Sequence, residues 1–217
     1  MWWVLTLLAC GGAPDAPPAS SPEAPPPAEA PVAIAAEPLD PAQVDRAVAR
    51  GRAAIAQLGG TLKARMQAAM AEGGPVHAVE TCASVAPGLP ASVQQMTGVT
   101  LGRSSLRLRN PANEAPGWVK AWLEAQGERP VEGVDGLAAP AEDGSAEVHV
   151  IVPIGVDPLC LTCHGSAEQI PADVGSVIDD RYPQDAARGY AAGDLRGAFW
   201  ASVPVTAGDE PAEPPPL

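Results

Sequence analysis

Cys160-Leu161-Thr162-Cys163-His164 has the form C-x-x-C-H, and Gly165 follows it. The two thiols stand three residues apart, on neighbouring positions of one helical turn, where both can reach the vinyl groups on one edge of a porphyrin. A histidine directly after the second thiol lies under the iron and offers an axial nitrogen. The stretch therefore predicts one covalently attached haem c, with His164 as an iron ligand.

Two other chemistries use closely spaced cysteines. A zinc knuckle needs a second pair of ligands at close spacing, and the remaining cysteines, Cys10 and Cys82, form no such pair. A bare C-x-x-C redox pair does not need a histidine directly after its second cysteine. Haem attachment is the interpretation that uses all three side chains.

The composition fits one folded domain with tails. The chain has 217 residues, a formal net charge of −13 and 26 prolines that gather at its two ends. This charge argues against nucleic acid as a partner, because phosphate recognition needs a basic patch. It suits a well-solvated protein, or one that docks a basic partner protein.

The first ten residues resemble a bacterial lipoprotein signal, with Leu7-Leu8-Ala9-Cys10 as the lipobox. The apolar run is too short to span a bilayer, and it lacks the Lys or Arg expected at the front of a signal. An unprocessed N-terminus with a free Cys10 is the alternative. Because haem c is attached outside the cytoplasm, we expect residues 1–9 to be removed and a lipid on Cys10 to anchor the protein to a membrane, in the periplasm or at the cell surface.

The rest of the chain divides by composition. Residues 10–39 are rich in Pro and Ala, which predicts a disordered, extended stalk. Asp40-Pro41 is a helix start, with an acidic N-cap and proline at the first helical position. We therefore predict a haem-binding domain over residues 40–207 and a disordered acidic tail over 208–217.

A long amphipathic helix is predicted from Asp40, because apolar side chains recur at spacings near three and four. It should end at Gly73-Gly74, and Gly59-Gly60 is a candidate kink. Such a helix packs on a core or pairs with a second copy of the chain in a homodimer. Met66 and Met70 are candidate axial ligands, although methionines at helical spacing more often belong to a core.

A second helix, opened by Pro75, carries Cys82. This thiol has no intramolecular partner once the other three cysteines are assigned, so it is either a buried free cysteine or an axial haem ligand. His77 is its rival for the ligand role. The third histidine, His149, stands in a predicted strand, where a structural role is commoner than ligation.

Arginines stand out at one place in this acidic chain. Leu106 and Leu108 alternate with arginines, which predicts a strand over residues 99–109 with one basic face. Arg103, Arg107 and Arg109 are candidates to bind haem propionates, because the guanidinium fork suits carboxylates. A solvated strand face is the alternative.

Further elements follow from local patterns. A helix from Pro116 carries Trp118 and Trp122, which we assign to the core or to one wall of a haem pocket. Residues 147–154 are predicted to form a strand that pairs with 136–139 across a turn at Asp143-Gly144. After the C-x-x-C-H stretch we predict a short helix, a turn and a closing strand over 198–205.

Taken in order, these stretches resemble a family of single-haem c-type domains with a PAS-like fold, known in cyanobacterial proteins and as sensor regions of histidine kinases. The matching segments are 73–75 with 80–82, 102–113, 153–154, 160–165, and 182–183 with 193–198. The resemblance implies an α+β fold, with an antiparallel sheet packed against helices. It also implies iron held by the motif histidine and by a cysteine on an earlier helix, here His164 and Cys82.

Cys/His ligation implies a low reduction potential, because a thiolate stabilises Fe(III). Our leading prediction is extracytoplasmic electron transfer with an unidentified redox partner. A redox or gas sensor for NO or CO, signalling through a separate partner, is the alternative. An enzyme of sulfur-compound oxidation ranks last, because the sequence shows no second haem and no acid–base constellation.

Overall fold

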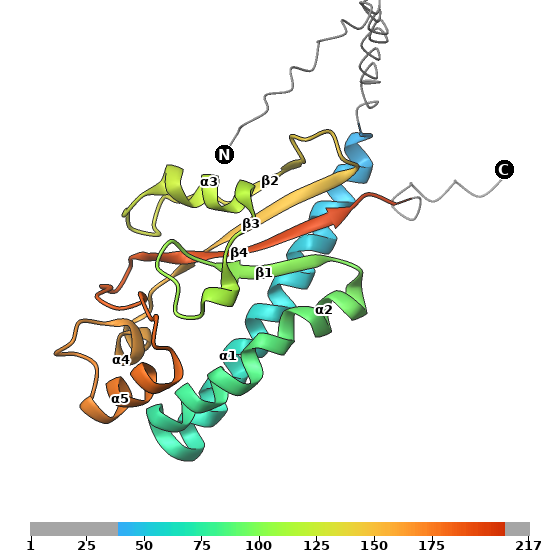
Figure 1. Ribbon diagram of the computed structural model, residues 1–217. Helices are drawn as coiled ribbons and strands as arrows, with labels where there is room; N and C mark the ends of the chain where they lie inside the picture. Colours follow the sequence, from blue (N-terminus) through green and yellow to red (C-terminus); the bar gives the residue numbers. More distant parts are fainter. Residues whose placement is uncertain (1–38, 207–217) are drawn as a thin grey trace, which may run out of the picture. The chain divides into compact units, whose positions relative to one another are not determined.

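The computed structural model describes residues 39–206 (Figure 1). Its helices are α1 (Pro41–Val85), α2 (Leu89–Thr97), α3 (Gly117–Gln126), α4 (Leu161–His164) and α5 (Ala172–Arg181), with 3₁₀ helices η1 (Ala86–Gly88), η2 (Pro111–Asn113) and η3 (Pro158–Cys160). Its strands are β1 (Thr100–Ser104), β2 (Leu137–Pro140), β3 (Glu147–Gly155) and β4 (Leu195–Pro204). The fold is α+β, as predicted. None of the described helices has the length and apolar character needed to cross a bilayer.

The four strands form one antiparallel sheet in the order β1-β4-β3-β2. The predicted pairing of β2 with β3 is confirmed, with Leu137 opposite Ile151 and Pro140 opposite Val148. In their connection Gly144 has φ 77°, a left-handed conformation that glycine adopts without strain. The closing strand, β4, lies between β1 and β3, so the last part of the chain completes the sheet.

One face of the sheet packs against α1 and α2. Val148 and Val150 of β3 point to this face because successive strand residues alternate between faces. Together with buried residues of α1, α2 and the other strands they form what we call the sheet core. Its members are Ala47, Ala54, Ile55, Leu58, Val93, Val99, Leu101, Val148, Val150, Ala201 and Val203.

Glycines let α1 approach the sheet closely. A Cβ atom on Gly51 would lie 2.8 Å from a methyl of Val203, and one on Gly59 would lie 3.2 Å from the Phe199 ring. The backbone stays helical through Gly59-Gly60, so the kink predicted there is wrong. At Gly59 the missing side chain makes room for an aromatic ring instead of bending the axis.

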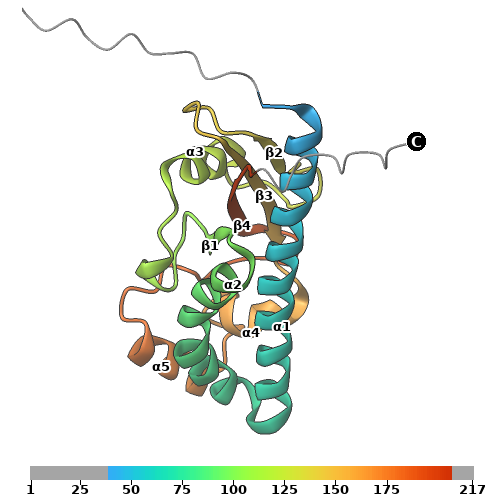
Figure 2. The same cartoon turned by 90° about the vertical axis from the view of Figure 1, so that its right-hand side faces the viewer.

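The bend in α1 lies at Gly74, where φ is 73° and ψ is −168°. This conformation ends the first helical run, and Pro75 opens the next, as predicted. We call residues 41–73 the first arm and 75–85 the second arm. The two arms fold back on one another in both views (Figures 1 and 2), and Ala69 and Ala78, one on each arm, are buried.

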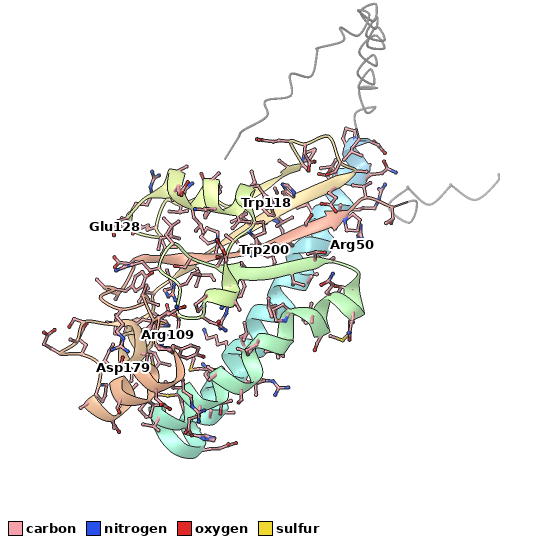
Figure 3. All side chains as sticks on the ribbon, viewed as in Figure 1. Arg50, Arg109, Trp118, Glu128, Asp179 and Trp200 are labelled. Atoms are coloured by element: carbon pink, nitrogen blue, oxygen red, sulfur yellow. The ribbon has the colours of Figure 1, made fainter. Side chains whose placement is uncertain are left out.

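The opposite face of the sheet carries α3. Trp118 of α3 stacks on His149 with ring centroids 3.9 Å apart, and meets Trp200 edge to face at 6.0 Å. Trp118 and Trp200 (Figure 3) pack against a second cluster, which contains the buried Val119 and Leu123. The alternative assignment of the α3 tryptophans to a haem-pocket wall is therefore wrong, and their assignment to a core is confirmed.

The strand predicted over 99–109 is shorter in the structure, because β1 ends at Ser104. Ser105 Oγ accepts a hydrogen bond from the Arg107 N–H and donates one to the Arg107 carbonyl, both at 3.1 Å. These local bonds turn the chain out of the sheet. Arg103, Arg107 and Arg109 consequently do not share one strand face.

Candidate functional site

The C-x-x-C-H stretch follows β3 and forms η3 and α4. Cys160 ends the 3₁₀ helix, and Cys163 and His164 close the short α-helix. The thiols of Cys160, Cys163 and Cys82 are all free. One helical turn thus presents the two motif thiols and the imidazole together.

A cavity lies against α4, both arms of α1 and the neighbouring ends of β1, β3 and β4. Cys160, Cys163 and His164 line it, and so does Cys82 from the second arm of α1. Leu159 also lines it and is 49% exposed, so the cavity opens to solvent beside the motif. The tertiary structure therefore brings together the four residues that the sequence analysis proposed for haem attachment and ligation.

The protonation state and hydrogen bonding of His164 suit an imidazole that binds a metal. Its Nδ1 lies 2.7 Å from the carbonyl oxygen of Ala187 and donates to it, which leaves Nε2 without a proton. Burial, with the nearby charges of Arg109 and Arg196, lowers the pKa of His164 to about 3. A neutral imidazole, hydrogen-bonded through one nitrogen and bare at the other, is the form that binds a metal.

Residues 185–190, which we call the strap, hold the motif. The Gly189 N–H donates to the Gly165 carbonyl at 2.7 Å, and the Tyr190 N–H donates to the His164 carbonyl at 3.0 Å. The Tyr190 ring meets the His164 ring edge to face, with centroids 6.3 Å apart. The strap therefore fixes both the backbone and the ring of the histidine.

Cys82 and His77 lie on the same arm but have different surroundings. Burial raises the pKa of the Cys82 thiol, and the charges of Arg103 and Arg109 partly offset this rise. The His77 side chain is 45% exposed and lies 3.7 Å from Glu72. His77 is not among the residues that line the cavity, so Cys82, and not its rival, shares the cavity with His164.

Arg109 lines the cavity but already has a carboxylate partner. Its Nε donates to Asp185 at 3.1 Å, and its Nη2 donates to the carbonyls of Cys163 and Ala187. Burial alone would raise the pKa of the Asp185 carboxyl, but hydrogen bonds from Arg109, Arg188 and the Ala187 N–H outweigh it and hold that pKa below its usual value. Arg109 thus ties the motif to the strap.

Arg107 does not line the cavity. Its guanidinium carbon lies 3.7 Å from the centre of the Tyr190 ring, and its Nη1 donates to the Arg188 carbonyl at 3.1 Å. The structure therefore places Arg107 against the strap, apart from the cysteines. Its expected position on a shared strand face depended on a strand that ends earlier.

Two cavity arginines lack an acidic partner. Arg103 lines the cavity, and within residues 39–206 its guanidinium makes no hydrogen bond or ion pair. Arg196 of β4 also lines it, and donates to the Arg107 carbonyl at 3.1 Å and the Tyr190 hydroxyl at 3.5 Å. Burial lowers the pKa of both guanidiniums, because the charged form is disfavoured away from water. The cavity therefore suits an anionic ligand.

Arg196 was not among the site residues predicted from the sequence. It lies far along the chain from the arginine-rich stretch, and only the pairing of β4 with β1 brings the two segments together. Its position in a segment that resembles the haem family was the available signal.

Met66 and Met70 also line the cavity, from the first arm of α1. Among the described residues no group of three or more His, Cys, Asp or Glu is placed to hold a bare metal ion.

Comparison with known proteins gave two matches. A model of the Tll0287-like family matches residues 36–204. The chain is also similar to the crystal structure of the cyanobacterial heme-protein Tll0287, with 25% sequence identity and a TM-score of 0.53, over 76% of this chain and 97% of that one. No curated protein matches the chain.

Proposed function

We propose, because the chain belongs to the Tll0287-like family, that it is a haem protein carrying one haem c attached through Cys160 and Cys163. The observation that carries this proposal is the single cavity onto which both motif cysteines, the neutral His164 imidazole and Cys82 open. The similar solved structure is itself that of a heme-protein, which supports the choice of cofactor.

The residues around the cavity fit such a group. Cys160 and Cys163 would bond its edge, while His164 Nε2 and Cys82 Sγ would take the two axial positions. Arg103 and Arg196, which have no carboxylate partner among the described residues, would bind the propionates. Bound haem supplies one-electron chemistry at its iron.

We propose extracytoplasmic electron transfer as the role. A Cys82 thiolate opposite His164 favours the ferric state and so lowers the reduction potential. The hydrogen bond from His164 Nδ1 to Ala187 raises the basicity of the other ring nitrogen, and the strap holds the ring in one orientation. The net charge of −13 favours a basic redox partner.

The test is haem attachment in the full-length chain, produced together with a c-type haem maturation system. We expect haem to stay with the polypeptide on a denaturing gel, and to be lost in the Cys160→Ala/Cys163→Ala variant. In Cys82→Ala the ferric low-spin spectrum should change, whereas in the matched variant His77→Gln it should not. An unchanged ferric spectrum in Cys82→Ala would rule out Cys82 as ligand.

A redox or gas sensor is the second function we propose. Met66 and Met70 line the cavity together with Cys82, and a small ligand that replaced Cys82 at the proposed iron would meet these apolar side chains. The PAS-like sensor domains that the sequence resembles support this choice. Binding of CO or NO to the ferrous protein would favour the sensor, and rapid exchange with small redox proteins without ligand binding would favour electron transfer.

We further propose that lipidated Cys10 anchors the protein to a membrane, in the periplasm or at the cell surface, through a stalk of residues 10–39. The lipobox and the need to export a haem c protein support this proposal. Cys10 and nearly all of the stalk lie outside the described residues. Cell fractionation tests it, because Cys10→Ser should move the protein from the membrane to the soluble fraction.

A further inference from the structure

The apolar stripe of the first α1 arm changes neighbours along its length. Leu58 lies in the sheet core, and Leu62 packs against that core. One and two turns further on, Met66 and Met70 continue the same side of the helix, since residues four apart are neighbours on a helix surface. Both methionines line the cavity, and in the described part of the chain neither belongs to a hydrophobic cluster.

Met66 stands level with Cys82 in the folded-back helix. Met66 lies eight residues before Gly74, and Cys82 lies eight residues after it. At about 1.5 Å per residue, each is about 12 Å along its arm from the bend. The arms run back alongside each other (Figures 1 and 2), and the side chains of Met66 and Cys82 both line the cavity. Met70, four residues before Gly74, lies nearer the bend.

We propose that Met66 is a second sulfur ligand for the axial position assigned to Cys82, so that the site can exchange a thiolate for a thioether. This inference rests on the proposed haem. A thiolate is an anion and favours ferric iron, whereas a neutral, soft thioether favours the ferrous state. Methionine has three rotatable side-chain bonds, so Met66 Sδ can approach the position without movement of the helix backbone.

The ligand exchange needs one electron and one proton, and both come from outside the protein. An external one-electron donor, such as a reduced redox protein, supplies the electron. The bond to Cys82 Sγ breaks, Cys82 takes one proton from solvent, and Met66 Sδ, which lines the same cavity, forms the new bond. Reoxidation reverses each change, with one proton returned to solvent. Because His/Met ligation raises the reduction potential, the electron is then held more tightly than the thiolate form would hold it.

The experiment uses the haem-loaded full-length chain in five forms: wild type, Cys82→Ala, Met66→Leu, and the doubles Cys82→Ala/Met66→Leu and Cys82→Ala/Met70→Leu. The readouts are the ferrous absorption spectrum and proton NMR of the ferrous protein, in which haem ring current shifts a coordinated methionine methyl far upfield. Met70→Leu is the matched control, because it makes the same substitution in the same cavity, one turn away.

We expect ferrous Cys82→Ala to be fully low-spin and to show one upfield methionine methyl. The second substitution Met66→Leu should abolish that signal and give a high-spin ferrous spectrum, whereas Met70→Leu should leave both unchanged. A high-spin ferrous Cys82→Ala protein, or a methyl signal lost with Met70→Leu in place of Met66→Leu, would overturn the proposal. In the wild type the same methyl signal should appear on reduction and disappear in Met66→Leu; its absence from the reduced wild type would overturn the exchange.

The proposed haem is checked separately, on a denaturing gel. A chain that carries no covalent haem would contradict the proposed function and this inference together. A chain that carries covalent haem but shows no thioether coordination would contradict the Met66 assignment alone.

Discussion

The two ends of the first α1 arm belong to one helix but have different neighbours. Near the sheet, Gly51 and Gly59 remove side chains so that the helix backbone can lie against Val203 and Phe199. Near the motif, the same side of the helix carries Met66 and Met70, which face a cavity in place of a core. The sheet core is built from buried apolar residues, whereas the cavity end holds partly buried arginines with no acidic partner among the described residues.

This difference indicates where a ligand contributes to stability. The sheet core excludes water through apolar contacts alone, so we expect it to fold without haem. The cavity end is held by the network of Asp185, Arg109 and the strap around His164, and a ligand would supply the missing negative charge. Substitutions at the two ends should therefore separate folding from haem binding.

Asp185→Asn should have the largest effect. The Asp185 side chain is 3% exposed and pairs with Arg109 and Arg188, so its loss leaves a buried cation uncompensated, at a cost of about 3–5 kcal/mol. Because hydrogen bonds hold the pKa of this carboxyl below its unfolded value, its contribution is complete above about pH 4 and is lost as the pH falls through the folded pKa. Urea unfolding of the haem-free protein at several pH values measures both effects.

Asp180→Asn is the control for that prediction, because Asp180 is an exposed carboxylate on α5, five residues before Asp185. It should change the free energy of unfolding by less than about 0.5 kcal/mol. Wild-type stability in Asp185→Asn would show that this carboxylate does not hold the cavity end together.

Gly51→Ala and Gly60→Ala test whether the sheet core needs the close approach of α1 at Gly51. The new methyl at Gly51 would lie 2.8 Å from Val203 and 2.9 Å from Val150, so we expect a loss of about 1–3 kcal/mol. At Gly60 no atom lies within 4 Å of the new methyl, and the helix should gain about 1 kcal/mol. Urea unfolding measures both, and the haem spectrum should change in neither. Stabilisation by both substitutions would contradict the close contact at Gly51.

Arg103→Gln and Arg107→Gln should have small effects on folding, with opposite signs. Without haem, removal of Arg103 should stabilise the protein by up to about 1 kcal/mol, because a partly buried guanidinium without a hydrogen-bond partner is lost. Removal of Arg107 should cost about 0.5–1 kcal/mol, because its contact with the Tyr190 ring is lost.

With haem bound, Arg103→Gln should lower the reduction potential more than Arg107→Gln does. The expected fall is about 60 mV if the lost stabilisation of the ferrous form is about 1.4 kcal/mol. Redox titration of the two holoproteins measures this difference. Equal potentials would argue against a propionate contact for Arg103.

Much of the local structure could be predicted because its causes are local. The start of α1 at Asp40-Pro41, its interruption at Gly74-Pro75 and the β2–β3 pairing follow from capping, φ preference and turn chemistry. Predictions that depended on distant neighbours were wrong. Gly59-Gly60 does not kink α1, since Phe199 lies against the helix there. The strand over 99–109 stops at Ser104, since the Ser105 side chain competes for backbone hydrogen bonds.

Residue types and their spacing were enough to identify the candidate functional groups: a C-x-x-C-H helix turn, an extra thiol on a preceding helix, and arginines in an acidic chain. Those follow from residue type and spacing within one or two turns. Which of these groups lie close together became clear only from the folded structure. It folds α1 back at Gly74 to bring Cys82 and Met66 to the motif, pairs Arg109 with Asp185, moves Arg107 onto Tyr190, and brings Arg196 into the cavity from the last strand. Such contacts join residues far apart in the chain and depend on long-range packing, which no short stretch of sequence specifies.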